Sequence, residues 1–503
     1  MAPIYFEGLH AGSIIVLAAA LFPLYVVGSI VYNLFLHPLR KFPGPLLHGA
    51  TVVPYCVKLN RGTLPYDVAA MHEKYGPVVR ISPNFLSFID AEAWRDIYGH
   101  RTGNLQGQEE MAKASIFYDT RGIPPSIINE SRDNHTVLRR QLAHGFSDRS
   151  MRLQEPIIGS YVDLMIRRLH EHCYEYSDDK TKTHKVLDLS RIFNYTTFDV
   201  ISDLAFGEPL GCLENFEDDP WIISMNAMVR VFGPIQALKH LGFEWVVAAI
   251  LKLGLLRSRQ AHMNATKAKL QRRMKLSMER PDLIEGLLRV KNLDFERIRL
   301  NAGTLMVAGS ETTATLLSGV VYLLLTNPDK MAKLVEEVRG SFQAESEITL
   351  TSVSSLNYML ACLDEALRRY PPVAVGMPRT VPAGGATVAG VHVPENSTVA
   401  VWQQACYQSS RNFEDPLAYK PERWINHDEK SRDRLDAVQP FHVGPRNCIG
   451  KNLAYSEMRL ILARLLYSFD LELVDKDKDW FDQKTFVLRD KPALNVYLTP
   501  VSR

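Results

Sequence analysis

The distribution of apolar and polar residues divides the chain into a short uncharged start and a long mixed remainder. Between Glu7 and Arg40 there is no Asp, Glu, Lys or Arg, and residues 14–36 are strongly apolar. A membrane helix needs about 20 such residues. The run is longer than a signal-peptide core, lacks a basic start and has no clear small-residue cleavage site. We therefore predict one uncleaved transmembrane anchor in residues 1–37, with a cleaved signal peptide as the alternative.

The residues that follow this run predict its orientation. Arg40 and Lys41 come directly after it, whereas only Glu7 precedes it. The positive-inside rule then places the rest of the chain in the cytosol. Residues 38–45 contain three prolines, which fix φ and disfavour helix. We expect this segment to be an extended spacer between the membrane and a globular domain.

Beyond the spacer, apolar spacing predicts a mainly helical fold with small peripheral sheets. Helical periodicity runs through much of residues 155–369, and strands are expected at 78–89, near 384–385, over 388–401 and in a terminal hairpin at 485–498. The sequence shows no repeat, low-complexity tract or long linker, so residues 38–503 are predicted to form one domain. Breaks between the helices are expected at Gly207, Pro220, Pro281 and Pro328.

Composition narrows the classes of function. The 503 residues carry a net charge of +2, which does not suggest a nucleic-acid partner. Six scattered cysteines without a C-x-x-C pair argue against a disulfide framework or a zinc site and suit a reducing compartment.

One cysteine lies in an unusual turn. Cys448 precedes a predicted helix, with Arg446 before it and Gly444 and Gly450 on either side. A thiolate is stabilised near a helix N-terminus, glycines allow close approach of a flat ligand, and arginine provides a fixed cation. These features suit a haem iron held by cysteine. The alternative is a buried free cysteine in a Gly-Pro turn.

A second motif interrupts the long apolar helical run of residues 301–326. Gly309 weakens the helix, and the Ser and Thr side chains beside it can bond back to carbonyls and widen it. Glu311 is followed directly by Thr312, and an acid next to a hydroxyl can relay protons. The alternative is a chance helix kink.

The pattern F-x-x-G-x-R-x-C-x-G, from Phe441 to Gly450, resembles the cytochrome P450 haem-thiolate family. The resemblance implies the cytochrome P450 fold and a bound haem b whose iron has Cys448 as its axial ligand. Phe441, Gly444 and Gly450 would contact the cofactor. Glu311 and Thr312 match the catalytic proton-relay residues on the oxygen-activation helix of the family.

The same resemblance implies contacts to the haem propionates and a structural network. His135, Arg139, Arg379 and Arg446 match the propionate-binding positions, although many relatives carry Trp where this chain has His135. The network matches E-x-x-R and the arginine of P-E-R-W, and its members would be Glu365, Arg368 and Arg423. We assign it to folding and to the integrity of the haem pocket.

Substrate and electron supply are also expected from the resemblance. The pocket would be formed by residues 103–125, Phe232 and residues 305–312, 373–377 and 486–488, which are mostly apolar and suit a hydrophobic small molecule. No G-x-G-x-x-G turn is present, so electrons from NADPH must arrive through a separate protein, NADPH–cytochrome P450 reductase, with cytochrome b5 as a further candidate. Arg140, Lys451 and Arg459 are candidate docking residues.

The H-P-L-x-K-F-P-G-P and A-G-S-E-T-T segments are similar to those of fungal microsomal members in secondary metabolism. We therefore expect a monooxygenase at the endoplasmic reticulum that hydroxylates a terpenoid, polyketide or alkaloid intermediate. Desaturation, oxidative ring closure or rearrangement is the alternative within the fold. A membrane-anchored haem-binding protein without catalysis is the alternative from another class.

Overall fold

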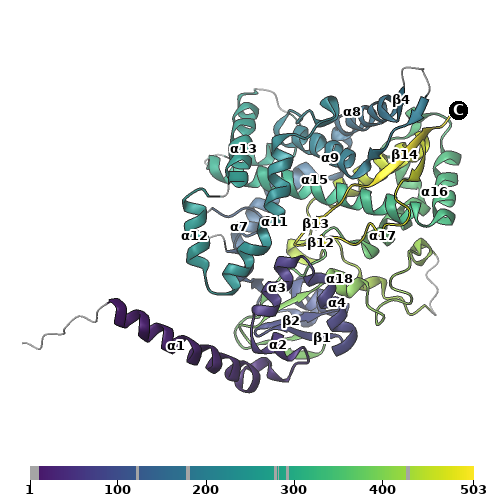
Figure 1. Ribbon diagram of the computed structural model, residues 1–503. Coiled ribbons are helices and arrows are strands. Elements are labelled where there is room, and N and C mark those ends of the chain that lie inside the picture. Colours follow the sequence, from purple (N-terminus) through teal and green to yellow (C-terminus); the bar gives the residue numbers. More distant parts are fainter. Residues whose placement is uncertain are drawn as a thin grey trace, which may run out of the picture.

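The computed structural model describes residues 11–119, 124–176, 182–255, 257–276, 280, 282–290, 294–425 and 431–502. Figure 1 shows a helical body with small sheets towards its lower and upper right edges, and one helix, α1, projecting away from it. The prediction of a mainly helical fold with small sheets is confirmed.

The projecting helix α1 (Ala11–Val31) continues as a π-helix, Tyr32–Leu36, and contains Pro23 without ending there. Its large apolar side chains from Leu21 onwards are mostly exposed. Among the described helices, α15 (Phe295–Leu325) is long and apolar enough to cross a membrane but is mostly buried, and Ala20–Leu36 is a shorter apolar helix. A membrane anchor in residues 1–37 therefore stays a prediction.

The predicted extended spacer is partly wrong. Residues Pro38–Lys41 form a 3-10 helix with proline at its first position, where the missing N–H costs nothing. Leu39 is fully buried, and the Arg80 amide donates to the Pro43 carbonyl at 2.7 Å. The segment is therefore packed against the body instead of being held away from it.

The helices supply most of the core. The helix pair α9 and α15 lies at its centre (Figure 1). Gly309 of α15 allows this approach, because a Cβ there would lie 2.7 Å from Ile201 Cδ1. The other α-helices are α2 (Leu46–Ala50), α3 (Val53–Arg61), α4 (Leu64–Tyr75), α5 (Glu92–Tyr98), α6 (Ser115–Tyr118), α7 (Arg132–Ala143), α8 (Asp148–His172), α9 (Leu189–Phe206), α10 (Cys212–Asn215), α11 (Pro220–His240), α12 (Glu244–Lys252), α13 (Arg257–Lys275), α14 (Glu285–Leu288), α16 (Pro328–Ser341), α17 (Asn357–Arg369), α18 (Gln403–Tyr407) and α19 (Lys451–Ser468).

Most predicted helix boundaries are confirmed. Gly207 ends α9 with φ +75°, and Pro220 and Pro328 open α11 and α16. Pro281 lies outside the described residues. Helix α15 starts at Phe295, earlier than predicted, because its first turns are polar and include an i,i+3 pair between Glu296 and Arg299.

The strands form several small sheets. The largest has the order β1-β2-β10-β7-β3, and a second has the order β11-β14-β6. The strands predicted over 78–89, near 384–385 and over 388–401 are confirmed. The strands are β1 (Val78–Ser82), β2 (Phe85–Phe88), β3 (Ala112–Lys113), β4 (Tyr174–Tyr176), β5 (Lys182–His184), β6 (Leu187–Asp188), β7 (Arg379–Thr380), β8 (Ala386–Val388), β9 (Val391–Val393), β10 (Thr398–Val401), β11 (Phe469–Leu473), β12 (Lys484–Thr485), β13 (Arg489–Asp490) and β14 (Asn495–Pro500).

The predicted terminal hairpin is shorter than expected. Strand β12 pairs with β13 over two residue pairs, whereas β14 pairs with β11 and β6. The apolar alternation of residues 495–500 therefore reflects a place in a different sheet, which local periodicity does not distinguish from a hairpin.

Candidate functional site

The cysteine turn, residues 441–450, forms a closed loop that we call the cysteine loop. The Cys448 amide donates to the Phe441 carbonyl at 2.8 Å, and Gly444–Arg446 form a 3-10 turn. Helix α19 begins at Lys451. Cys448 therefore stands just before the first turn of a helix, as predicted.

The two glycines of the loop have different surroundings. Gly444 has φ +78°, and a Cβ there would lie 1.9 Å from the Tyr98 carbonyl oxygen. Its missing side chain thus allows packing against the end of α5. A Cβ on Gly450 would lie 3.7 Å from Phe146 Cε1 and 4.0 Å from Cys448 Sγ. Gly450 is therefore the glycine that lies beside the sulfur.

The Cys448 thiol is accessible. All six cysteines fall within the described residues, and Cys448 is exposed whereas the other five are buried. Burial of the loop nonetheless raises the pKa of the Cys448 thiol, while the Gly450 amide, Arg139 and Lys451 act to lower it. A thiol that is accessible but surrounded by protein opens onto an interior space.

One face of α15 is accessible in the same way. Ala308 is exposed and Val307, Gly309 and Thr312 are partly exposed, although the helix crosses the middle of the molecule (Figure 1). Val307, Ala308 and Thr312 therefore border an accessible interior space, whereas Gly309 packs against Ile201. The predicted widening of the helix is wrong. Residues 308–313 remain regular α-helix, with the Thr312 hydroxyl donating to the Ala308 carbonyl at 2.6 Å.

A cluster of cations gathers near the cysteine loop, and carboxylates including Glu110 and Glu130 lie beside it. Arg446 Nε lies 3.5 Å from Glu110, and Arg446 Nη1 donates to the Glu130 carbonyl at 3.0 Å. Arg379 is 5% exposed, and its Nε has no hydrogen-bond partner among the described residues. Burial, together with Arg379 and Arg446, lowers the pKa of Lys113 well below its ordinary value.

His135 and Arg139 lie on the same face of α7, as predicted, but they bind differently. Burial, helped by Arg446 and Arg139, lowers the pKa of His135 to about 4, so the ring is neutral at pH 7. Arg139 donates to the Asn447 carbonyl at 2.7 Å and also to the Asn447 side chain. Arg139 therefore holds the residue next to Cys448.

Glu311 and Thr312 point in different directions. Successive residues on an α-helix are about 100° apart around its axis. Thr312 is on the accessible face, whereas Glu311 is buried and forms an ion pair with Lys491. Lys491 Nζ also donates to the Thr315 hydroxyl at 2.8 Å. The structure thus separates the two predicted relay side chains and gives the acid a lysine partner.

A polar cavity of about 180 Å³ adjoins this pair, and we call it the Glu311 cavity. Glu311 and Asn194 line it. Glu311 Oε2 and Asn194 Oδ1 are buried acceptors with no partner in the described part of the chain. Polar cavities of this size hold ordered water. Charged residues around it are Asp188, Arg191, Asp218, Arg230, Arg489, Asp490 and Lys491.

The predicted structural network is present and fully buried. Arg368 donates to both carboxylate oxygens of Glu365 at 2.8 and 2.9 Å, and Arg423 Nε lies 3.3 Å from Glu365. Trp424 Nε1 adds a hydrogen bond to Glu365 at 3.0 Å. Arg368 also donates to the carbonyls of Tyr407, Pro416 and Ala418.

Three of the predicted substrate stretches, together with Phe232, meet in one place. Phe117, Phe232, Val375 and Phe486 line a narrow space whose remaining volume is about 10 Å³. The rings around it are Tyr55, Phe85, Phe117, Phe232, His240, Trp402 and Phe486, and we call it the aromatic slot. Residues 120–123, within the predicted stretch 103–125, lie outside the described residues.

A family profile described as Cytochrome P450 matches residues 43–495, which is most of the chain. The chain belongs to the cytochrome P450 family. Its fold is therefore the P450 fold, and membership implies haem-thiolate chemistry, electrons from a redox partner and a hydrophobic substrate.

Individual relatives of this P450 are fungal enzymes. The cytochrome P450 monooxygenase tpeC of Talaromyces stipitatus is 47% identical over 96% of this chain and 94% of its own length. The averantin hydroxylase of Dothistroma septosporum is 42% identical, covering 95% and 90%. The trichothecene C-15 hydroxylase of Fusarium sporotrichioides is also 42% identical, covering 95% and 96%. This P450 is accordingly a monooxygenase.

The residues of this P450 fit a haem group. Haem needs a thiolate ligand, a flat interior space and cations for two propionates. The accessible Cys448 thiol, the accessible face of α15 and the cation cluster of Lys113, Arg379 and Arg446 meet those needs. The unpaired Arg379 Nε, in particular, is a buried donor that an anion would satisfy.

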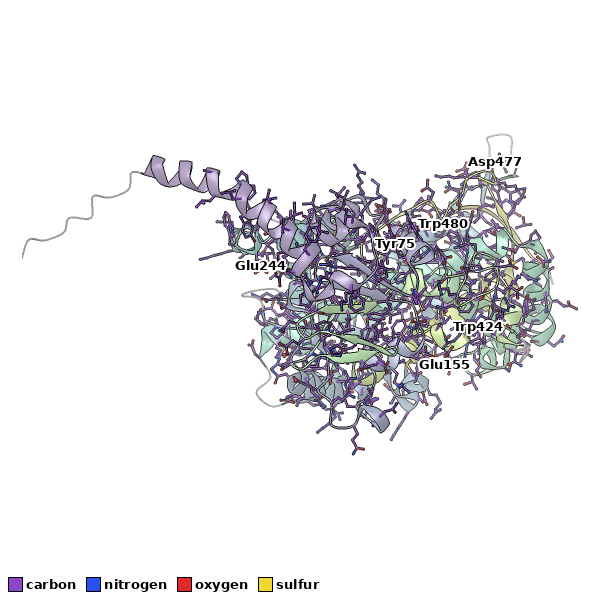
Figure 2. All side chains as sticks on the ribbon, turned by 90° about the horizontal axis from the view of Figure 1, so that it is seen from below. Tyr75, Glu155, Glu244, Trp424, Asp477 and Trp480 are labelled. Atoms are coloured by element: carbon purple, nitrogen blue, oxygen red, sulfur yellow. The ribbon has the colours of Figure 1, made fainter. Side chains whose placement is uncertain are left out.

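A groove of about 690 Å³ lies beside the first turns of α19. Two of the predicted docking residues, Lys451 and Arg459, line it, whereas Arg140 does not. Glu155 is at this groove and lies well away from α1 in Figure 2. The groove also has acidic members, including Asp364, which accepts a hydrogen bond from Tyr455 at 2.6 Å.

Sequence reasoning missed three residues of the site. Lys491 has no local motif and meets Glu311 across 180 residues of chain. Lys113 lies in a two-residue strand that pairs with Arg379. Trp402 follows β10 and lines the aromatic slot. The apolar run 398–402 could have suggested a buried Trp402, but only the fold brings these side chains to the site.

Proposed function

We propose that this P450 hydroxylates a hydrophobic intermediate of fungal secondary metabolism, such as a terpenoid, polyketide or alkaloid. The observation that carries the proposal is the accessible Cys448 thiol inside the protein, together with the buried cation cluster. The relatives named as hydroxylases favour hydroxylation. Haem b, when bound, would supply the activation of dioxygen.

The chain's own residues would hold that cofactor. Cys448 would bind the iron as a thiolate, and Arg139 would position the loop through Asn447. Arg379, Arg446 and Lys113 would bind the propionates, with neutral His135 beside them. Phe441 and Gly450 would lie against the ring near the sulfur.

Proton delivery would use the two faces of α15. Water in the Glu311 cavity would exchange protons with Glu311, whose Oε2 has no partner among the described residues. Thr312, on the accessible face, would pass a proton to the reacting oxygen. The ion pair with Lys491 keeps the carboxylate turned towards the cavity, so the acid must move, or water must bridge, to reach Thr312.

Electrons would come from NADPH through NADPH–cytochrome P450 reductase, with cytochrome b5 as a second donor. The groove lined by Lys451 and Arg459 is the docking surface that we propose. Its charges of both signs favour a partner with a mixed charge pattern.

We further propose that residues 1–37 are a single-pass anchor in the endoplasmic reticulum membrane, with residues 38–503 as the cytosolic catalytic domain. Exposed apolar side chains support contact with lipid beyond α1. Phe243, Trp245, Leu253 and Leu255 are exposed in and around α12. Figures 1 and 2 place α12 on the same side of the molecule as α1.

The haem assignment is tested by Cys448→Ala, with Cys56→Ala as the control because Cys56 is a buried free cysteine. Cys448→Ala should lose haem, whereas Cys56→Ala should retain it. Retained haem with an unchanged spectrum in Cys448→Ala would exclude this ligand.

The reaction is tested by comparing metabolite masses in strains with and without the gene. A lost product one oxygen heavier than the accumulated precursor supports hydroxylation or epoxidation. A difference in hydrogens alone, or no difference in mass, would instead indicate desaturation, ring closure or rearrangement.

A further inference from the structure

Two residues that line the aromatic slot each have a buried polar atom without a partner among the described residues. Gln236 on α11 is 5% exposed, and Trp402 is 2% exposed. Gln236 Oε1 is an acceptor and Trp402 Nε1 is a donor, and neither has a hydrogen-bond partner within the described residues. Buried polar atoms are rarely left unpaired in native proteins. An unpaired donor and an unpaired acceptor on two residues of one slot are groups that a polar ligand entering the slot could satisfy.

The orientation of the Gln236 amide follows from its one bond. Gln236 Nε2 donates to the Phe117 carbonyl at 3.1 Å. A carbonyl can only accept, so the nitrogen must face Phe117 and Oε1 must point the other way. The unpaired oxygen is therefore a property of the structure and does not depend on an arbitrary choice between the two ends of the amide.

The edge of the Trp402 ring is left open by a glycine. Gly376 forms a β-bridge with Trp402, and a Cβ on Gly376 would lie 3.0 Å from Trp402 Nε1. Gly376 also lines the aromatic slot. A side chain here would force the indole N–H to shift, so glycine keeps the donor in place at the slot.

The rest of the lining is aromatic. The rings of Phe117 and Phe232 are 5.5 Å apart, and those of Tyr55 and His240 are 5.0 Å apart. Rings at such spacing are in direct contact with one another, and their free faces and edges suit packing against another flat ring. The remaining space of about 10 Å³ has room for one water at most, so a larger ligand must displace rings as it binds.

We propose that the aromatic slot recognises a flat aromatic substrate that carries a hydroxyl group. The hydroxyl oxygen accepts from Trp402 Nε1, and its hydrogen is donated to Gln236 Oε1. One hydroxyl thus satisfies both buried atoms, while the rings of the slot hold the body of the substrate. This inference rests on the proposed function, because the slot contains residues of the predicted substrate pocket.

The test measures binding to the full-length holoenzyme by equilibrium dialysis, which does not depend on turnover. Three probes share one ring system: 2-naphthol can donate and accept, 2-methoxynaphthalene can only accept, and naphthalene can do neither. The variant is Trp402→Phe, which keeps an aromatic ring and removes the N–H. The control is Trp94→Phe, because Trp94 is also buried but its Nε1 donates to the Ala437 carbonyl at 2.9 Å.

Wild type should bind 2-naphthol most tightly. Trp402→Phe should weaken the binding of 2-naphthol and of 2-methoxynaphthalene about tenfold, which is the effect of one buried hydrogen bond. Its affinity for naphthalene should not change. Trp94→Phe should not change the order of the probes. Both variants lose buried ring volume, but the melting temperature should fall further for Trp94→Phe, because that variant also loses a satisfied hydrogen bond.

Three results would overturn the proposal. The first is that wild type shows no preference for 2-naphthol, which includes binding none of the probes. The second is that Trp402→Phe binds 2-naphthol with unchanged affinity. The third is that the melting temperature of Trp402→Phe falls as far as that of Trp94→Phe. The carbon monoxide difference spectrum of each sample tests the haem-thiolate assignment separately. A normal spectrum with one of these results refutes the slot assignment alone.

Discussion

Glu365 and Glu311 are both buried carboxylates that face a cation, at 0% and 4% exposure, yet their surroundings differ. Both oxygens of Glu365 accept hydrogen bonds, from Arg368, Trp424 and the Lys420 amide. Glu311, which lines the Glu311 cavity, uses Oε1 for Lys491 and Thr315, and its Oε2 has no partner among the described residues.

This difference distinguishes a carboxylate that stabilises the fold from one that can take part in proton transfer. A fully paired buried ion costs much to disturb and has no free lone pair for chemistry. A carboxylate that has a partner on only one oxygen and lies beside a cavity large enough for water can exchange a proton with that water without disrupting the fold. We therefore assign Glu365 to stability and Glu311 to proton transfer, and the following experiments can break or sharpen that contrast.

The largest effect is expected for Arg368→Ala. It leaves Glu365 and three backbone carbonyls without their main donor in a fully buried site. The free energy of unfolding should fall by about 3–5 kcal/mol, measured by denaturant titration. Arg230→Ala is the control, because its 3.1 Å pair with Asp490 is exposed, and it should cost less than about 1 kcal/mol. Equal losses would refute the structural role of the network.

Glu311→Gln should mainly affect the chemistry. Removing a proton-transfer group lowers the rate by about 100-fold or more, seen as product formed per minute and as a rise in hydrogen peroxide per NADPH oxidised. Glu365→Gln is the matched control and should lower stability without changing that ratio in the folded fraction. An unchanged ratio in Glu311→Gln would remove Glu311 from the relay.

His72 is a buried base with no ionic partner at hydrogen-bond distance, and it shows how much free energy it costs to charge such a group. Burial lowers the pKa of His72 to about 4, and the ring nitrogens lie 2.8 Å from the Gly76 carbonyl and 2.6 Å from the Ser87 hydroxyl. Because the unfolded histidine has a pKa near 6.5, the unfolded chain binds more protons between these values, and stability rises with pH. The contribution of neutral His72 to the free energy of unfolding is thus fully present above about pH 6.5.

This contribution is lost as the pH falls towards 4. Between pH 7 and pH 5, it should decrease by about 2 kcal/mol. Denaturant titration of wild type and His72→Gln at both values measures the change. The difference between the two proteins should shrink at pH 5, and a difference that is the same at both values would contradict the prediction.

The smallest effect is expected for Lys491→Met. Loss of the cation leaves Glu311 unpaired, but water in the Glu311 cavity can solvate it, so the free energy of unfolding should fall by only about 1–2 kcal/mol. Lys491→Arg keeps the charge and should restore the stability. A loss as large as that of Arg368→Ala would show that the two carboxylates are alike.

The contrast also shows which parts of the structure can be predicted from local sequence motifs. E-x-x-R, P-E-R-W and the cysteine loop were predicted with correct members, because each is set by residues within a turn or two and by the family pattern. The prediction that residues 38–45 are an extended spacer was partly wrong, because proline rules are local whereas burial of Leu39 depends on the body. The terminal hairpin was too long because β14 pairs with β11.

The sequence by itself determined the family, the helical class, the cysteine loop and the position of the acid–hydroxyl pair on α15. These depend on neighbouring residues, where the chain itself sets the geometry. Only the tertiary structure decided that Glu311 turns from Thr312 to Lys491, that Lys113 joins Arg379, and that Gln236 and Trp402 face one slot. Such contacts join residues far apart in the chain, and their partners are chosen by packing of whole elements, which no local pattern records.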